Sequence, residues 1–207
     1  MKRRDAIKNL SLSLGYVVSA PTIMNILSSC TAEGTTWTPL YFTNQEKQMI
    51  IHLTDIIVPT TDIAGAIDVN TAQFLDRMYA NIIGKEKKKN FRKGAEIFGN
   101  EFLKSFNKNP EKGTKEEFEQ LFSSYFDLSE EQSKKVLDRQ QQNPKNIPTS
   151  QIEEYRIYEF LFEVRQNTLF AYFTSEKVGE EILNYDPVPG SFEPCIPLSE
   201  VGNSWSL

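Results

Sequence analysis

Four short segments of the chain have the spacing of a capping box, in which a Ser or Thr is followed three residues later by a Glu or Gln. These segments are residues 43–46, 114–117, 129–132 and 150–153, and each comes before an apolar run at helical intervals. A capping box satisfies two backbone N–H groups at the start of a helix, so each one predicts that a helix begins there. We find no segment with the strict alternation that indicates a strand. The sequence therefore predicts an all-α fold.

Two more helices are predicted between the first box and the second. After Pro59, turn-forming residues lead to an apolar stripe that includes Tyr79, with Asp68 as the expected N-cap and Gly84 as the expected end. A lysine cluster at 85–89 then runs into phenylalanines at helical spacing up to residue 106, which indicates a solvated helix start. A chain of 207 residues has room for one domain. We expect a single compact bundle of about six to seven helices, followed by an irregular, proline-rich C-terminal strap.

Residues 152–173 differ from the other predicted helices, because apolar side chains are spread around most of the helix circumference. A helix that is apolar on nearly every side must be buried on nearly every side. Two interpretations are open. The segment is either the central helix of the bundle, or a helix that turns one face to another protein.

The first 29 residues have the features of a cleaved export signal. Arg3, Arg4 and Lys8 form a cationic start, and residues 10–27 are apolar but diluted by small and polar residues and by Pro21. This dilution favours a cleaved signal over a membrane-spanning helix. The run Arg-Arg-Asp-Ala-Ile-Lys at 3–8 resembles a twin-arginine signal, which directs the export of folded proteins. The alternative is the basic start of a general secretion signal.

The sequence Leu-Ser-Ser-Cys at 27–30 resembles a bacterial lipobox, so we expect cleavage before Cys30 and a lipid on its thiol. The alternative is a plain thiol near a general cleavage site. A lipid would hold the protein on the periplasmic side of a bacterial membrane, with residues 30–40 as a tether and residues 41–207 as the helical domain. An acylated Cys30 would leave Cys195 without an intramolecular partner, so we expect Cys195 to be buried or to pair with another chain.

The residue inventory argues against most kinds of active site. One His and two Cys are too few for the usual zinc, copper or haem sites, and a formal charge of −5 argues against nucleic acid as a partner. His52 lies among apolar residues and is expected in the core or at its boundary. Glu159 and Glu163 lie one helical turn apart, a spacing that would suit an acid–base pair but is common among helical carboxylates. We assign no catalytic, cofactor or metal site to this chain.

Two stretches carry a family resemblance. The first is Thr-Leu-Phe-Ala-Tyr-Phe-Thr-Ser-Glu at 168–176, continued by Asn-Tyr-Asp-Pro-Val-Pro-Gly-Ser-Phe at 184–192. The second is Ile-Val-Pro-Thr-Thr-Asp-Ile-Ala-Gly-Ala at 57–66. Together they resemble the gluconate 2-dehydrogenase subunit 3 family, small exported subunits of membrane-associated, FAD-dependent sugar and polyol dehydrogenases. The similarity covers most of residues 43–198.

The resemblance implies an accessory role without catalysis. The small subunit of this family accompanies a large flavoprotein of the glucose-methanol-choline oxidoreductase type, assists its maturation and supplies the export signal for both. FAD is then expected in the large subunit, and a cytochrome subunit, which some complexes of this kind add, is a further candidate partner. A flavoprotein folded around FAD could not pass a channel built for unfolded chains, so a partner that carries Arg3 and Arg4 would solve its export.

The late motif supplies the expected partner interface. Prolines and a glycine fix or permit turns there, and Tyr185 and Phe192 offer aromatic anchors. The expected interface residues are Tyr172, Phe173, Asn184, Tyr185, Asp186, Pro187, Pro189, Gly190 and Phe192. The alternative is a strap that only covers the domain's own core. Two other functions compete with the accessory role: a stand-alone lipoprotein module that binds a ligand or a protein, and an enzyme that uses Glu159 and Glu163.

Overall fold

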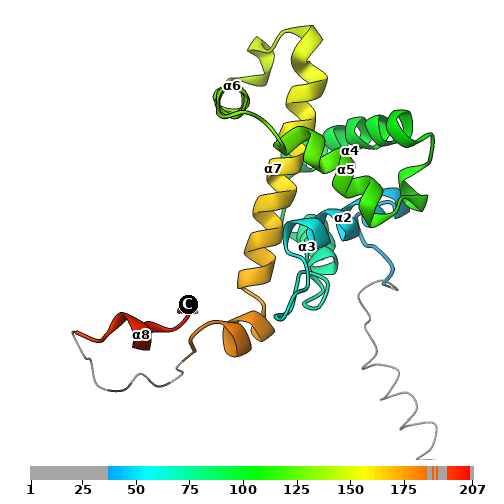
Figure 1. Ribbon diagram of the computed structural model, residues 1–207. Helices are drawn as coiled ribbons and strands as arrows, with labels where there is room; N and C mark the ends of the chain where they lie inside the picture. The colour runs from blue at the N-terminus through cyan, green and yellow to red at the C-terminus, as the bar shows by residue number, and fades with distance from the viewer. Residues whose placement is uncertain (1–36, 186–187, 189, 191–194, 206–207) are drawn as a thin grey trace, which may run out of the picture. The chain divides into compact units, whose positions relative to one another are not determined.

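The computed structural model describes residues 37–185, 188, 190 and 195–205. The fold presented here is that of the unit Thr38–Leu207. Its α-helices are α2 (Asn44–Ile57), α3 (Thr71–Asn81), α4 (Lys85–Phe106), α5 (Lys115–Phe126), α6 (Glu130–Gln140), α7 (Ile152–Phe173) and α8 (Leu198–Val201). Short turns of 3-10 helix occur at η1 (Pro110–Lys112), η2 (Pro144–Asn146) and η3 (Thr149–Gln151), and a π-helical turn at η4 (Val178–Ile182). The described residues form no strand, and the predicted all-α bundle is confirmed (Figure 1).

Helix α7 is the centre of the bundle. It packs against α2, α3, α4 and α6, and its most extensive contact is with α4 (Figure 1). The rings of Phe91 and Phe98 on α4 lie 5.2 and 5.7 Å from the ring of Phe160 on α7. All three side chains are fully buried. The central-helix interpretation is therefore right for this part of residues 152–173, because burial of these aromatic side chains drives the packing.

A glycine brings α4 and α7 into close contact. A Cβ atom added at Gly94 would lie 2.5 Å from the Cβ of Phe160 and 2.7 Å from the backbone oxygen of Arg156. The two helices can approach this closely only because α4 presents no side chain at that point.

Three of the four predicted capping boxes form. The side chains of Thr43, Thr114 and Ser129 each accept a bond from the backbone N–H three residues later, and the reciprocal bond is present in each box. The prediction at Ser150 was wrong. The N–H of Gln151 donates to the carbonyl of Pro148 (2.9 Å), so the chain enters α7 through the η3 turn, and α7 begins at Ile152 without a side-chain cap.

The expected ends of α3 were also wrong. Its N-cap is Asn70, which has a left-handed backbone (φ 54°), and its last residue is Asn81. Gly84 is the N-cap of α4. Asp68 does not cap the helix, because its carboxylate accepts bonds from the Thr60 hydroxyl (2.6 Å) and the Gly65 N–H (2.7 Å) within the preceding loop.

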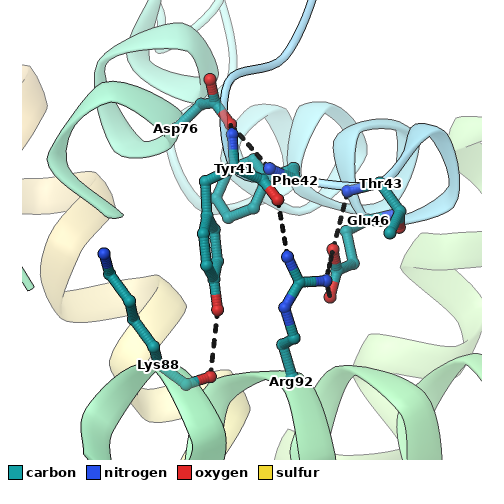
Figure 2. A network of polar contacts seen from close by, with 7 residues as sticks. All are labelled: Tyr41, Phe42, Thr43, Glu46, Asp76, Lys88 and Arg92. Atoms are coloured by element: carbon teal, nitrogen blue, oxygen red, sulfur yellow. Dashed lines mark hydrogen bonds and ion pairs between the residues drawn. The ribbon is translucent and has the colours of Figure 1, made fainter. Parts of the chain in front are cut away.

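The start of the domain is held by the carboxylate of Asp76, which is buried on α3. This carboxylate accepts three backbone N–H bonds, from Leu40 (2.7 Å), Tyr41 (2.9 Å) and Phe42 (2.8 Å). Figure 2 shows the bonds from Tyr41 and Phe42. Without this carboxylate, these three N–H groups before α2 would lack hydrogen-bond acceptors within the domain. Asp76 thus pairs the backbone of residues 40–42, which we call the entry segment.

Arg92 on α4 holds the same segment from the other side. Its guanidinium donates to the Tyr41 carbonyl (2.7 Å) and to the Glu46 carboxylate (2.9 Å), and it lies 4.3 Å from the centre of the Tyr41 ring. The Tyr41 hydroxyl donates to the carbonyl of Lys88 (3.1 Å), as Figure 2 shows. Charge-assisted bonds of this kind are stronger than neutral ones, so the entry segment is firmly attached to α3 and α4.

Two expectations about burial fail near the C-terminus. Phe170 and Phe173, in the last turn of α7, are each 53% exposed, so α7 is not buried on every side along its whole length. Cys195 is exposed, which corrects the expectation that it is a buried small residue. The pairing of Cys195 with another chain stays a prediction.

Candidate partner interface

The two motif segments meet at the C-terminal end of α7. The hydroxyl of Tyr172, in the last turn of α7, donates to the carbonyl of Ala64 in the loop that follows α2 (2.6 Å). The Tyr172 side chain is buried, and burial raises the pKa of its phenol. Tyr172 therefore joins the early motif to the late one from inside the domain.

The early motif is a tight loop. A Cβ atom at Gly65 would lie 2.4 Å from the backbone nitrogen of Thr60, so only glycine fits at this close approach between two backbone segments of the loop. The N–H of Ala66 donates to the carbonyl of Val58 (2.8 Å), and bonds from Thr60 and from the Gly65 N–H lower the pKa of Asp68. These bonds fix the conformation of the loop and keep the Asp68 carboxylate ionised.

Asn184 organises the described part of the late motif. Its side chain donates to the carbonyls of Val201 (2.7 Å) and Asn203 (2.5 Å), and its N–H donates to the carbonyl of Ser204 (2.9 Å). Gly202 has a φ of 64° beside the Asn184 amide. These bonds bring the C-terminal residues back beside the end of η4.

A hollow of about 510 Å³ opens between α7, η4 and the C-terminal segment. Its apolar walls are Phe173, Leu183, Tyr185 and Trp205. Phe173 and Tyr185 are each 53% exposed, and Trp205 is 62% exposed. Large aromatic side chains that remain half exposed in a folded domain are typical of protein interaction sites. We call this feature the aromatic hollow.

Other exposed apolar side chains gather in the same parts of the chain. Of the fourteen large apolar residues that are exposed among those described, ten belong to residues 63–74 or 170–205. They are Ile63, Phe74, Phe170, Phe173, Tyr185, Val188, Ile196, Leu198, Val201 and Trp205. Phe74 on α3 and Phe170 on α7 lie 6.3 Å apart between ring centres. Most of the exposed large apolar side chains therefore lie in these two parts of the sequence, which contain the motifs.

The expected interface residues divide into three groups. Phe173 and Tyr185 line the aromatic hollow, and Gly190 is exposed. Tyr172 and Asn184 instead hold the local structure together. Four of the expected interface residues, Asp186, Pro187, Pro189 and Phe192, lie outside the described residues. So do the residues expected to form the export signal, Arg3, Arg4 and Lys8, and the expected lipidation residue, Cys30.

Sequence reasoning missed two members of the aromatic hollow, Leu183 and Trp205. A Trp in the otherwise small and polar sequence Gly-Asn-Ser-Trp-Ser at 202–206 was a usable signal for the second of these.

Comparison with protein families matches residues 44–190 to the model described as Gluconate 2-dehydrogenase subunit 3. The chain belongs to that family. The match includes the early motif, and the late motif as far as Gly190. No curated protein and no solved structure matches the chain.

Residues 37–185, 188, 190 and 195–205 hold no group of three His, Cys, Asp or Glu side chains placed to bind a metal ion. Over the same residues, none of the helices is long and apolar enough to cross a bilayer. The ring of His52 lies 5.0 Å from that of Phe118, and burial lowers its pKa, so the imidazole is neutral at the boundary of the core.

The two carboxylates considered as an acid–base pair line a separate cleft of about 440 Å³, which Lys87 and Asn90 also line. Glu159 accepts bonds from Arg156 (2.6 Å) and Asn90 (3.3 Å). Burial raises the pKa of Glu163, whose carboxyl is hydrogen-bonded to the buried Tyr79 hydroxyl. Glu159 is thus held in a structural network, whereas Glu163 has the altered proton affinity.

We expect Glu163→Gln to stabilise the domain at neutral pH. The pKa of Glu163 is raised by folding, so its contribution to stability is present below the ordinary pKa of a glutamate and is lost as the pH rises through the raised value. Gln removes the cost of ionisation and keeps an acceptor for Tyr79. The melting temperature of the variant should exceed that of the wild type by a few degrees at pH 7 and match it at pH 4. An equal difference at both pH values would contradict this account.

Proposed function

We propose that this chain is the non-catalytic accessory subunit of a periplasmic, membrane-associated, FAD-dependent sugar or polyol dehydrogenase. Its partner is a large flavoprotein of the glucose-methanol-choline oxidoreductase type, which holds the FAD, and a cytochrome is a further candidate subunit. The chain assists the maturation of the flavoprotein and carries the export signal, with Arg3, Arg4 and Lys8, for both proteins. A lipid on Cys30 holds the complex at the membrane.

The observation that carries this proposal is one exposed apolar site, formed by the late motif and the C-terminal segment at the end of α7 where Tyr172 is bonded to the early motif. Phe173, Tyr185 and Trp205 remain half exposed around the aromatic hollow, while Tyr172 and Asn184 fix the backbone beneath them. Exposed aromatic side chains on a preformed support lose little conformational entropy on binding. An accessory subunit needs this kind of surface, whereas a chain that works alone would bury these side chains.

The entry segment supports the role of a membrane tether. Leu40, Tyr41 and Phe42 are held by Asp76, ten to twelve residues after Cys30. Ten extended residues span at most about 35 Å, so a lipid on Cys30 would keep the domain close to the bilayer.

Purification of the full chain from its native membrane in mild detergent tests the proposal. We expect a complex with a larger protein that has the absorbance spectrum of a flavin. Replacing Phe173, Tyr185 and Trp205 together by Ala should weaken this complex by about tenfold or more, because aromatic anchors contribute most of the binding energy at protein interfaces.

A matched control is available elsewhere on the domain. Ile82, Leu103 and Leu137 are 75%, 48% and 52% exposed, and replacing them by Ala removes similar apolar area away from the hollow. The complex should survive that change. Recovery of the wild-type chain as a monomer, with dehydrogenase activity that persists when the chain is deleted, would refute the proposal.

The alternative function, a stand-alone lipoprotein that binds a ligand or a protein, is favoured by the polar cleft around Glu159 and Glu163. That function predicts that the chain is purified alone and that replacing Asn90 and Glu159, which line the cleft, abolishes its binding. The accessory role predicts that the same replacements leave the flavoprotein complex intact.

A further inference from the structure

The aromatic hollow has a charged border. Glu176 and Glu180 line it beside Phe173 and Tyr185, and both carboxylates are exposed. They lie on the chain that leaves α7, in and just before the η4 turn. Apolar and acidic groups are therefore presented together on one side of this turn.

A second hollow of about 450 Å³ lies on the other side of η4, against the early-motif loop. Asp62, Asp68 and Glu181 line it, together with Lys177. Among the residues that line the two hollows there are thus five carboxylates and one cation. Asp68 stays ionised because its hydrogen bonds within the loop lower its pKa.

We infer that this end of the domain receives a basic segment of the partner protein, in which an apolar side chain enters the aromatic hollow and neighbouring Lys or Arg side chains pair with Glu176 and Glu180. The inference rests on the proposed function and adds the chemistry of the partner's surface. An Arg is especially suited, because its guanidinium binds carboxylates in a fork and stacks on rings such as Tyr185 and Trp205.

Charge complementarity selects this occupant over the others. A second copy of the chain would place the same carboxylates against each other in a symmetric contact, and like charges at an interface are unfavourable. A bilayer of anionic lipids would be repelled for the same reason. An apolar peptide without cations would fill the aromatic hollow but leave Glu176 and Glu180 unpaired and partly desolvated at the contact.

The test measures the association rate of the full chain with the flavoprotein recovered in the purification described above, at low and at high ionic strength. Complementary charges steer association, so the wild-type rate should fall steeply as salt is added. Reversing both carboxylates, with Glu176→Lys and Glu180→Lys, should slow association at low salt by about tenfold or more and make the rate nearly independent of salt. Neither side chain has a bonded partner among those that the structure describes, so the fold should be retained, which far-UV circular dichroism checks.

The control reverses the same number of charges at a distance. Glu111 and Glu119 are exposed, and the double change Glu111→Lys and Glu119→Lys alters the net charge equally. Equal rates for the two double variants, or a wild-type rate that does not respond to salt, would overturn the inference while leaving the proposed function in place. The absence of any complex between the wild-type chain and a flavoprotein would overturn both.

Discussion

Asp76→Ala is expected to release the entry segment and to destabilise the domain by about 3 kcal/mol or more, since each buried polar group left unpaired costs about 1–3 kcal/mol. Asp76 is only 1% exposed, and its carboxylate accepts hydrogen bonds from three N–H groups, those of Leu40, Tyr41 and Phe42. Urea denaturation followed by circular dichroism measures the loss.

The path of the loss is also testable. Once freed from Asp76, the entry segment is held mainly by Arg92 and by burial of Phe42, so limited proteolysis should cleave near residues 38–43 before the rest of the domain unfolds. Asp76→Asn, which keeps one acceptor oxygen, should fall between the wild type and Asp76→Ala. Glu131→Ala, which removes an exposed carboxylate, is the control and should change stability by less than about 0.5 kcal/mol. A stability for Asp76→Ala equal to that of this control would show that the three bonds contribute little.

Gly94→Ala is expected to cost about 2 kcal/mol, even though Ala favours a helix over Gly by about 1 kcal/mol. The added methyl group would lie 2.5 Å from the Cβ of Phe160 and 2.7 Å from the Arg156 carbonyl oxygen. Both neighbours belong to or lie next to the α7 backbone, so α4 and α7 would have to separate. The midpoint of urea denaturation should fall without a large change in its slope.

Gly99→Ala is the matched comparison, because Gly99 is also buried on α4, five residues later. Its added methyl group would lie 2.7 Å from the Nε2 atom of Gln45, which is the free end of a flexible side chain and can rotate away. The helix preference of Ala should then dominate, and stability should stay unchanged or rise slightly. Equal losses at both positions would mean that the close approach of α4 and α7 is not the cause.

The features that sequence reasoning placed correctly are local ones. The boxes at Thr43, Thr114 and Ser129 each join residues three positions apart, so their residue types are enough to predict them. The failure at Ser150 is also local in origin, because the turn after Pro148 competes for the same backbone groups. Asp68 has a side chain suited to an N-cap, yet its carboxylate instead accepts hydrogen bonds from the Thr60 hydroxyl and the Gly65 N–H.

The candidate interface was only partly accessible to sequence reasoning. Its place in the late motif was predicted from the pattern of aromatic residues, prolines and glycines, with Tyr185 and Phe192 as the expected anchors. Tyr185 lines the hollow together with Phe173, and Phe192 lies outside the described residues. That Tyr172 points inward depends on the carbonyl of Ala64, which is 108 residues away in sequence. The position of Trp205 in the wall of the aromatic hollow depends in the same way on the hydrogen bonds from Asn184 to the C-terminal segment.

Residue types and their spacing are enough to predict the helices, most of their starts, the family resemblance and the acidic character of the chain. Each of these depends on residues within one or two helical turns of each other or on a simple residue count. The fold is needed to tell which aromatic side chains stay exposed, how Asp76 holds the entry segment and where the carboxylates of two distant loops come together. These features arise from contacts between residues 17 to 108 positions apart, and no local pattern records such a contact before the helices have packed.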